Sequence, residues 1–297
     1  MRFYIVDVFA ERKYSGNQLA VFRDSGRLPG TTMQRIASEM HYSETTFITS
    51  ERLSRGGYDV RVFTPGAEIP FAGHPTLGTA FIVQSEIIGE QVPAVNLNMK
   101  VGQIPVTFSY RNGKADILWM RQKEPEFGVE LDSGATVKAL GLRASDLDGD
   151  LPVMEVSTGL PFVIVPLRSL EAARRARLDE SMFLRVMERA GLPKRKAEGV
   201  LVFSPETYRK ENDLNVRVFV PGVGVPEDPA TGSGNGCLAA YLVRNRFRGR
   251  DHVELRVEQG YEIGRKSLLL LKAGSEGGRI QVNVGGKVQF VGKGEFP

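Results

Sequence analysis

Cysteine and histidine are scarce in this 297-residue chain, which contains one cysteine, Cys237, and three histidines. A single cysteine excludes an intrachain disulfide and a cysteine-based metal cluster, and this usage indicates a reducing, cytoplasmic setting. The histidines, His41, His74 and His252, form no His-x-x-His or His-x-x-x-His pair, so we expect no zinc site. The sequence therefore predicts a protein without bound metal.

The chain also lacks long apolar runs and a strong charge of either sign. No uncharged apolar stretch approaches the roughly 20 residues of a membrane helix, and the N-terminus becomes charged too early for a signal peptide. The 39 basic and 35 acidic residues give a net charge of +4, too small an excess to bind nucleic acid. One basic run, from Arg168 to Lys196, is typical of a solvated helix face, with a phosphate or acidic partner as the alternative. We expect neither nucleic acid nor a membrane as a partner.

Three common ligand-binding and catalytic signatures are missing. The phosphate-binding pattern Gly-x-x-x-x-Gly-Lys-Ser/Thr does not occur, and the glycine-rich segment 232–236 (GSGNG) does not fit the dinucleotide fingerprint. The Gly-x-Ser-x-Gly elbow of serine hydrolases is also absent. These absences argue against nucleotide-binding enzymes of those types and against serine hydrolases.

What the sequence does contain is one segment twice. Segments 61–70 (RVFTPGAEIP) and 217–226 (RVFVPGVGVP) share Arg, Val, Phe, Pro, Gly and Pro at identical spacing, 156 residues apart. A glycine-rich turn follows each copy, at 72–78 (AGHPTLG) and 230–236 (ATGSGNG), and segments 15–22 and 158–165 form a second, weaker echo. A period this long is not a solenoid repeat, whose units run about 20–50 residues. It predicts two similar halves, each with a loop leading into a helix N-terminus, and one active site between them.

Strand-like segments dominate the chain and helices are few. We expect helices at 31–41, 75–87 and 236–246, and shorter ones at 136–140, 170–177 and 180–190. Thr31 and Gln34 suggest a capping box, and the pairs Asn112-Gly113 and Gly285-Gly286 suggest tight hairpin turns. The pattern predicts an α+β fold of two pseudo-symmetric domains, each a curved, mostly antiparallel sheet or barrel around a central helix.

The length of the chain exceeds that of a usual single core, so two domains are expected. We place the N-terminal domain at 1–127 and the C-terminal domain at 128–286, with a final strand around 287–297 packing back onto the first domain. The Asp- and Gly-containing segment 128–151 is interpreted as a connection between the halves.

The two glycine turns are the first candidates for a binding site. A helix N-terminus presents unpaired N–H groups and a positive dipole end, so it binds carboxylate or phosphate readily. Two such termini in similar halves could hold one small anion between them. The alternative is that these glycines only permit close packing between helix and sheet.

Four side chains are candidates for chemistry. His74 begins the first of these helices, where the helix dipole lowers the pKa of the imidazole, and it is either a proton donor or acceptor for an anion or a structural hydrogen-bonding group. Asp228 precedes the second turn and Ser233 opens the second helix, so each is either a cap or a site residue. Glu44 lies between a helix and a strand and is, by spacing alone, a surface glutamate.

Together, these segments resemble the PhzF-like family of phenazine biosynthesis. The resemblance rests on segments 63–76, 227–234, 7–9, 16–21, 43–45 and 157–161. It implies a diaminopimelate-epimerase-like fold with its active site between the two domains, and a homodimer. It also implies a trans-2,3-dihydro-3-hydroxyanthranilate isomerase-like activity without metal or cofactor.

The resemblance also implies roles for individual residues. Glu44 would move a proton between ring carbons, with His74 and Asp228 assisting proton transfer. The substrate-binding set would comprise Ser43, Gly73, Gly232, Ser233 and Gly234. Gln18, where many members of the family have proline, is a departure of little expected consequence.

The related epimerases and proline racemases use two cysteines, one at each glycine turn, as opposed acid and base. Ala72 and Thr231 stand at those positions here, and Cys237, deeper in the second helix, is expected in the core. This departure favours a one-base proton shift by Glu44. We therefore expect a cofactor-independent isomerase of a small carboxylate-bearing molecule, with an amino-acid racemase or epimerase and a non-catalytic small-acid-binding protein as alternatives.

Overall fold

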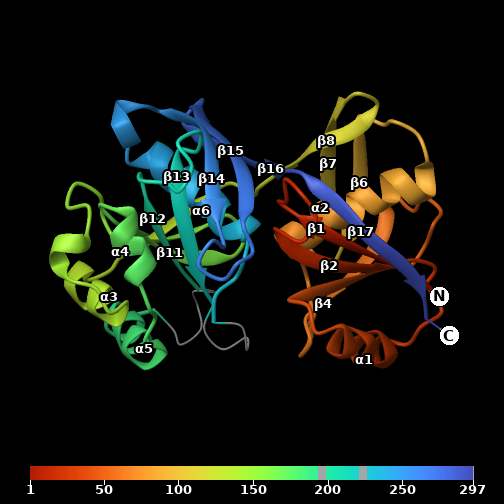
Figure 1. Cartoon of the computed structure of the whole chain (residues 1–297), viewed down its shortest axis with the longest axis horizontal. Helices are drawn as coiled ribbons and strands as arrows, with labels where there is room; N and C mark the ends of the chain where they lie inside the picture. The colour runs from red at the N-terminus through yellow and green to blue at the C-terminus, as the bar shows by residue number, and fades with distance from the viewer. Residues whose placement is uncertain (193–198, 221–225, 297) are drawn as a thin grey trace. The chain divides into compact units, whose positions relative to one another are not determined.

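The computed structural model describes residues 1–192, 199–220 and 226–296 and divides the chain into two compact units (Figure 1). Unit 1 comprises Met1–Arg121 with Gly285–Pro297, and unit 2 comprises Gln122–Val284. The structure is mixed α and β, with many strands and few helices. Among the residues that the structure describes, no helix combines the length and apolarity needed to cross a membrane.

In unit 1, a mostly antiparallel set of strands surrounds one helix. β1 (Arg2–Val8) pairs antiparallel with both β17 (Val288–Glu295) and β2 (Asn17–Phe22), and β2 pairs parallel with β3 (Glu44–Ile48). β3 pairs antiparallel with β4 (Tyr58–Phe63), which continues through a parallel pairing to β6 (Ala94–Met99) and an antiparallel one to β5 (Glu68–Ile69). β6, β7 (Gly102–Arg111) and β8 (Lys114–Arg121) complete the set by antiparallel pairing. Helix α2 (Gly73–Ile82) contacts β1, β2, β3, β6, β7, β8 and β17, so it is the central helix of this unit.

Unit 2 repeats this order of pairings. β9 (Glu126–Glu130), β10 (Met154–Ser157) and β11 (Pro161–Pro166) are antiparallel neighbours, and β11 pairs parallel with β12 (Gly199–Ser204). β12 pairs antiparallel with β13 (Leu214–Phe219), β13 parallel with β14 (His252–Gln259), and β14 antiparallel with β15 (Ser267–Glu276). Helix α6 (Gly232–Arg244) contacts β10, β11, β12, β14 and β15. The pseudo-symmetric α+β fold predicted from the repeat is therefore confirmed.

Smaller helices cover the outer faces of the two sheets. α1 (Gly30–Met40) packs on β3 and β4 over a cluster that includes Phe22, Phe47 and Phe63. In unit 2, α3 (Ser133–Ala139), α4 (Leu170–Arg175) and α5 (Glu180–Arg189) share a second core with β11 and β12. Short turns η2 (Ala144–Asp146) and η3 (Phe247–Gly249), and strand β16 (Arg279–Gly286), complete the assignment.

Two local predictions are wrong for identifiable reasons. α1 has Pro29 at its N-cap without a side-chain cap, and Gln34 donates instead to the carbonyls of Thr64 and Pro65, so the capping box does not form. Gly285 and Gly286 lie inside β16 and make no turn; glycine at 285 instead permits close packing, since a Cβ there would lie 2.5 Å from the ring of Trp119. The turn at Asn112-Gly113 between β7 and β8 is confirmed.

The segment 128–151 is not a free connection. It carries part of β9, which pairs with β10, and the whole of α3. Leu131, Val137 and Leu140 are buried in the core of unit 2. These apolar residues outweigh the Asp- and Gly-rich composition that suggested a linker. The parts of the predicted basic run and of the second repeat at 193–198 and 221–225 lie outside the described residues.

The two central helices begin earlier than predicted. α2 starts at Gly73 and passes at Val83 into a π-helical turn, η1 (Val83–Ile88), and α6 starts at Gly232. Glycine allows α2 to approach its sheet closely, because a Cβ at Gly78 would lie 2.6 Å from Leu19 and 2.9 Å from Val8. The glycine turns are therefore the first turns of the helices themselves.

Candidate active site

Each glycine turn presents an open helix N-terminus. Ala72 is the N-cap of α2 and Thr231 is the N-cap of α6, and the side chain of neither N-cap residue bonds to the first turn. The first N–H groups of a helix have no intrahelical partner and attract anions. Gly73 and Gly232 are the first residues of their helices, and His74 and Ser233 are the second. The repeat therefore places His74 and Ser233 at equivalent positions.

The duplicated segment also builds the same clamp in each unit. In unit 1, Arg61 donates two hydrogen bonds to Glu68, of 2.9 and 2.8 Å, and its guanidinium lies 5.1 Å from the centre of the Phe63 ring. In unit 2, Arg217 donates bonds of 2.9 and 2.7 Å to Glu227 and lies 4.9 Å from the ring centre of Phe219. We call these two sets the Arg–Phe–Glu clamps.

The clamps correct the alignment of the repeat. Glu68 lies four residues before the N-cap Ala72, and Glu227 lies four residues before the N-cap Thr231. Val62 pairs with Ile69 in unit 1, and Val218 pairs with Asp228 in unit 2. Pro70 is therefore equivalent to Pro229 rather than to Pro226, and Ile69 is equivalent to Asp228.

Strand β3 brings Glu44 to α2. Side chains alternate along a strand, so Glu44 shares a face with Thr46, whose hydroxyl lies 2.8 Å from that of Thr79 on α2. On that face the Glu44 carboxylate, 18% exposed, has its Oε2 atom 3.5 Å from Nε2 of His74. Ser43 precedes β3 directly and is half-buried. Two residues 30 positions apart in the sequence thus meet at the start of α2.

The imidazole of His74 is buried and neutral. Its side chain is 5% exposed, and burial lowers the pKa of His74 to about 3, although the Gln18 carbonyl acts in the opposite direction. The cause of the lowered pKa is thus burial, where the sequence suggested the helix dipole. Nε2 lies 3.3 Å from the carbonyl oxygen of Gln18, and a carbonyl only accepts hydrogen bonds, so Nε2 carries the ring proton. At neutral pH the contact with Glu44 therefore joins a carboxyl group and a neutral donor, and is not an ion pair.

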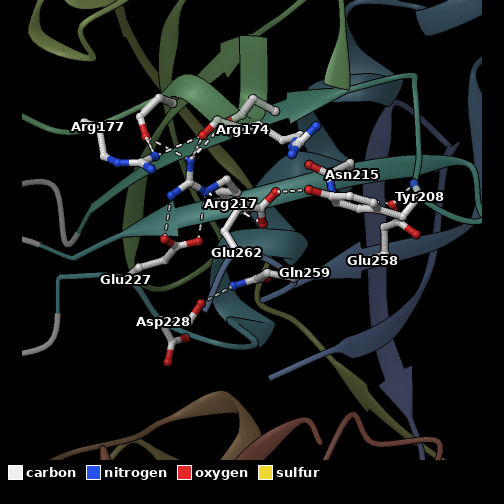
Figure 2. Close-up of polar contacts among 12 residues, drawn as sticks. Arg174, Arg177, Tyr208, Asn215, Arg217, Glu227, Asp228, Glu258, Gln259 and Glu262 are labelled. Atoms are coloured by element: carbon white, nitrogen blue, oxygen red, sulfur yellow. Dashed lines mark hydrogen bonds and ion pairs between the residues drawn. The ribbon is translucent and has the colours of Figure 1, made fainter. Parts of the chain in front are cut away.

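In unit 2, Asp228 is held by a polar network at the start of α6, of which Figure 2 shows the contact with Gln259. Its N–H donates to the Val218 carbonyl at 3.0 Å, and its own carbonyl accepts a 2.8 Å bond from Nε2 of Gln259. The hydroxyl of Thr231 donates to Oδ2 of Asp228. Oε1 of the buried Gln259 accepts from the N–H of Thr231 and from Nδ2 of Asn235. Backbone and side chain of Asp228 are thus both fixed.

The remaining predicted binding residues surround these groups. Gly73 is buried in unit 1 beside His74, and Gly232, Ser233 and Gly234 form the buried first turn of α6 in unit 2. A Cβ at Gly234 would lie 3.4 Å from Leu201 and from Thr231. Among the described residues, no group of three or more His, Cys, Asp or Glu side chains is arranged to hold a metal ion.

Cys237 lies in the middle of α6 and is fully buried, as predicted. Its Sγ donates to the Leu160 carbonyl at 3.4 Å, and burial raises the pKa of the thiol to about 12. A thiol in this state provides no thiolate at neutral pH. The N-cap positions themselves carry a methyl group and a hydroxyl, at Ala72 and Thr231.

Known proteins share this fold and this sequence pattern. The sequence matches the family of phenazine biosynthesis-like proteins, PhzC-PhzF, over residues 6–294. The chain belongs to this family. An uncharacterized isomerase of Mesorhizobium japonicum is 34% identical over 99% of this chain and 98% of its own. The trans-2,3-dihydro-3-hydroxyanthranilate isomerase of Pseudomonas aeruginosa is 32% identical over 94% of this chain and 92% of its own.

Solved structures agree with this assignment. The crystal structure of a Bacillus anthracis protein of the PhzF family is 27% identical, covers 100% of this chain and 99% of its own, and has a TM-score of 0.89. A probable proline racemase from Agrobacterium radiobacter, 12% identical with a TM-score of 0.64 over 100% of this chain and 92% of its own, shares the fold alone. The protein is therefore an isomerase of the PhzF family with an epimerase-like fold.

Sequence reasoning missed several residues of this arrangement. The Gln259–Thr231–Asn235 network depends on β14, which lies more than twenty residues further along the chain. The clamp glutamates were hidden because they follow their arginines by seven residues in unit 1 and by ten in unit 2. The pattern Glu-x-Pro-x-x-Gly, shared by Glu68 and Glu227, was the signal that could have revealed them.

Proposed function

We propose that this PhzF-like protein is a cofactor-independent isomerase of a small carboxylate-bearing molecule, with Glu44 as its single acid/base. The family supports the reaction class, and relatives named trans-2,3-dihydro-3-hydroxyanthranilate isomerases suggest the substrate class. In the proposed reaction the Glu44 carboxylate accepts a proton from a carbon beside an unsaturated bond. The electron pair left behind shifts along the conjugated system, and Glu44 returns the proton to a different carbon. No net oxidation or reduction occurs.

The contact between Glu44 and His74 is the observation that carries this proposal. A general acid/base needs a carboxyl group in a sheltered position near its target proton, with hydrogen-bonding neighbours that hold its orientation. Glu44 is largely buried on the face of β3 that meets α2, and the neutral His74 lies 3.5 Å away. A neutral imidazole beside Glu44 does not compete for the transferred proton, since its pKa is about 3.

In this proposal the partners of Glu44 would come from unit 2. Asp228 would assist proton transfer, and Ser233 with the first-turn N–H groups at Gly232 and Gly234 would bind the substrate carboxylate. Ser43 and Gly73 would complete that set from unit 1. The uncapped N-termini of α2 and α6 support this assignment, because hydrogen-bond donors at a helix start stabilise anions.

The test uses trans-2,3-dihydro-3-hydroxyanthranilate in heavy water, with isomerisation and deuterium incorporation followed together. We expect turnover by the wild type, and a loss of at least about 100-fold in kcat for Glu44→Gln, because general acid–base catalysis contributes that much or more. Glu39→Gln, a change of an exposed glutamate on α1, is the matched control and should retain full activity. Full activity of Glu44→Gln would refute the role of Glu44.

The two alternatives predict different outcomes, the first of them with amino acids as substrates. A racemase would invert an amino-acid centre, which circular dichroism detects, but Ala72 and Thr231 offer no thiol at the helix starts and Cys237 is buried. A non-catalytic binding protein would bind the probe without turnover or deuterium exchange. Either result would contradict the proposed isomerase.

A further inference from the structure

Among the described residues of unit 2, Arg217 and Glu227 form a buried ion pair with several hydrogen bonds. The side chain of Arg217 is 3% exposed and that of Glu227 is 7% exposed. Nε and Nη2 donate to the two carboxylate oxygens of Glu227, so the pair is bidentate (Figure 2). A second carboxylate, that of Glu262, lies 3.8 Å from Nε and accepts a 2.9 Å bond from the hydroxyl of Tyr208.

The third nitrogen of Arg217 binds the end of a helix. Nη1 donates to the carbonyl oxygens of Ala173 at 2.8 Å, Ala176 at 2.9 Å and Arg174 at 3.3 Å. These carbonyls belong to the C-terminal turn of α4, where the N–H of Ala176 and the side chain of Arg177 also donate to them. One guanidinium therefore links α4, β13 and the segment that contains Glu227.

The strand register places Asp228 on the opposite side of this clamp. Val218 and Asp228 are directly paired, so their side chains share a face, whereas Arg217 and Phe219 point to the other face. Leu201, which pairs with Val218, contacts the position of Gly234 at 3.4 Å, so the shared face is that of α6. The clamp thus grips the backbone from the α4 side and presents the adjacent Asp228 carboxylate on the α6 side.

The clamp of unit 1 provides a natural comparison. Arg61 and Glu68 occupy the same positions but are 33% and 18% exposed, and Glu68 also pairs with Lys100 at 2.8 Å. The residue next to Glu68 is Ile69, which has no group that could transfer a proton. The clamp of unit 2, next to Asp228, is therefore more deeply buried than that of unit 1, and its arginine also binds the end of α4.

We propose that Arg217 and Glu227 are positioning residues for the reaction, and that they act by fixing the carboxylate of Asp228. This inference rests on the proposed function, in which Asp228 assists proton transfer. A side chain that is misplaced by about 1 Å can cost two orders of magnitude in rate, so a clamp on the neighbouring residue has catalytic value.

The test is a double-mutant cycle between Glu227→Gln and Asp228→Asn, with trans-2,3-dihydro-3-hydroxyanthranilate as the probe. In the wild-type background we expect Glu227→Gln to lower kcat about tenfold to a hundredfold, with KM changed less than about twofold. In the Asp228→Asn background we expect Glu227→Gln to cause no further loss. A purely structural role for Glu227 predicts the same loss in both backgrounds, and that result would overturn the inference.

Two further variants keep this test decisive. Glu68→Gln alters the equivalent clamp of unit 1, and whatever loss it causes should be equal with Asp228 present or replaced. If Glu227→Gln does not fold, Arg217→Met/Glu227→Met replaces the buried pair with apolar side chains, a change that buried ion pairs often tolerate, and the same cycle is measured. A wild type that does not turn over the probe would refute the proposed function and this inference together. An active wild type with an additive cycle would refute the inference alone.

Discussion

Burial of His74 makes the stability of this protein sensitive to acid. The ordinary pKa of 6.5 falls to about 3 in the folded chain. Between these values the unfolded chain binds a proton that the folded chain does not, so the free energy of unfolding rises with pH from about 3 to 6.5 and is lost on acidification. Each pKa unit corresponds to about 1.36 kcal/mol, so this group alone costs about 2 kcal/mol at pH 5 and about 5 kcal/mol below pH 3.

The variant His74→Gln removes this titration. Its side-chain amide can still donate to the Gln18 carbonyl, which accepts a hydrogen bond from the imidazole N–H in the wild type. We expect the wild type to lose about 2 kcal/mol more than the variant between pH 7 and pH 5, measured by urea unfolding at each pH. Attraction between a protonated His74 and Glu44, 3.5 Å away, would reduce the difference, so 2 kcal/mol is an upper value.

His252→Gln is the matched control for this measurement. The side chain of His252 is 71% exposed and contacts only the neighbouring Asp251 among its described ion-pair partners. Replacing it should change the free energy of unfolding at pH 7 by less than about 0.5 kcal/mol. Equal losses between pH 7 and pH 5 for the wild type and His74→Gln would show that the imidazole is not kept neutral by burial.

Three other perturbations test the surrounding structure. Cys237, whose thiol pKa is raised to about 12 by burial, should react with a disulfide reagent at pH 8 only after unfolding in urea, and rapid labelling of the native protein would contradict this. Arg217→Met should lower the free energy of unfolding by about 3–5 kcal/mol because Glu227 stays buried without its partner, whereas Arg61→Met in the more exposed clamp should cost about 1 kcal/mol or less; equal losses would refute the difference. Gly78→Ala should lower the free energy of unfolding by about 1–3 kcal/mol despite alanine's better helix propensity, because the added Cβ would lie 2.6 Å from Leu19. Unchanged urea unfolding would show instead that the sheet residues move to accommodate the methyl group.

The part of the fold that could be predicted from the sequence was the part marked by the internal repeat. Recurrence of segment 61–70 at 217–226 predicted two similar halves, and the pairings of β2–β3–β4–β6 and β11–β12–β13–β14 follow the same parallel and antiparallel order. Local signals without tertiary support failed. The capping box of Thr31 and Gln34 does not form because Gln34 hydrogen-bonds to segment 64–65 instead. The polar segment 128–151 is not a linker because its few apolar residues are buried in the core of unit 2.

The candidate site was less accessible because its contacts depend on strand register. Proximity of Glu44 to His74 requires that β3 start at Glu44 and turn that side chain toward α2. A shift of one residue would point Glu44 away from α2, toward the face of Phe47. Spacing alone carries no such information, so only the resemblance to a family identified Glu44.

The structure also shows how the two halves of the duplicated scaffold differ at the proposed catalytic positions. Leu19 pairs with Glu44 where β2 meets β3, and Phe162 pairs with Gly199 where β11 meets β12, so Gly199 occupies the position of Glu44 in unit 2. A Cβ at Gly199 would lie 2.4 Å from the Phe219 carbonyl, which leaves no room for a side chain there. Conversely, Asp228 replaces the apolar Ile69 of unit 1. Both halves therefore have the Arg–Phe–Glu clamp and the open helix start. They differ in their carboxylates, since Glu44 has no counterpart in unit 2 and Asp228 has none in unit 1.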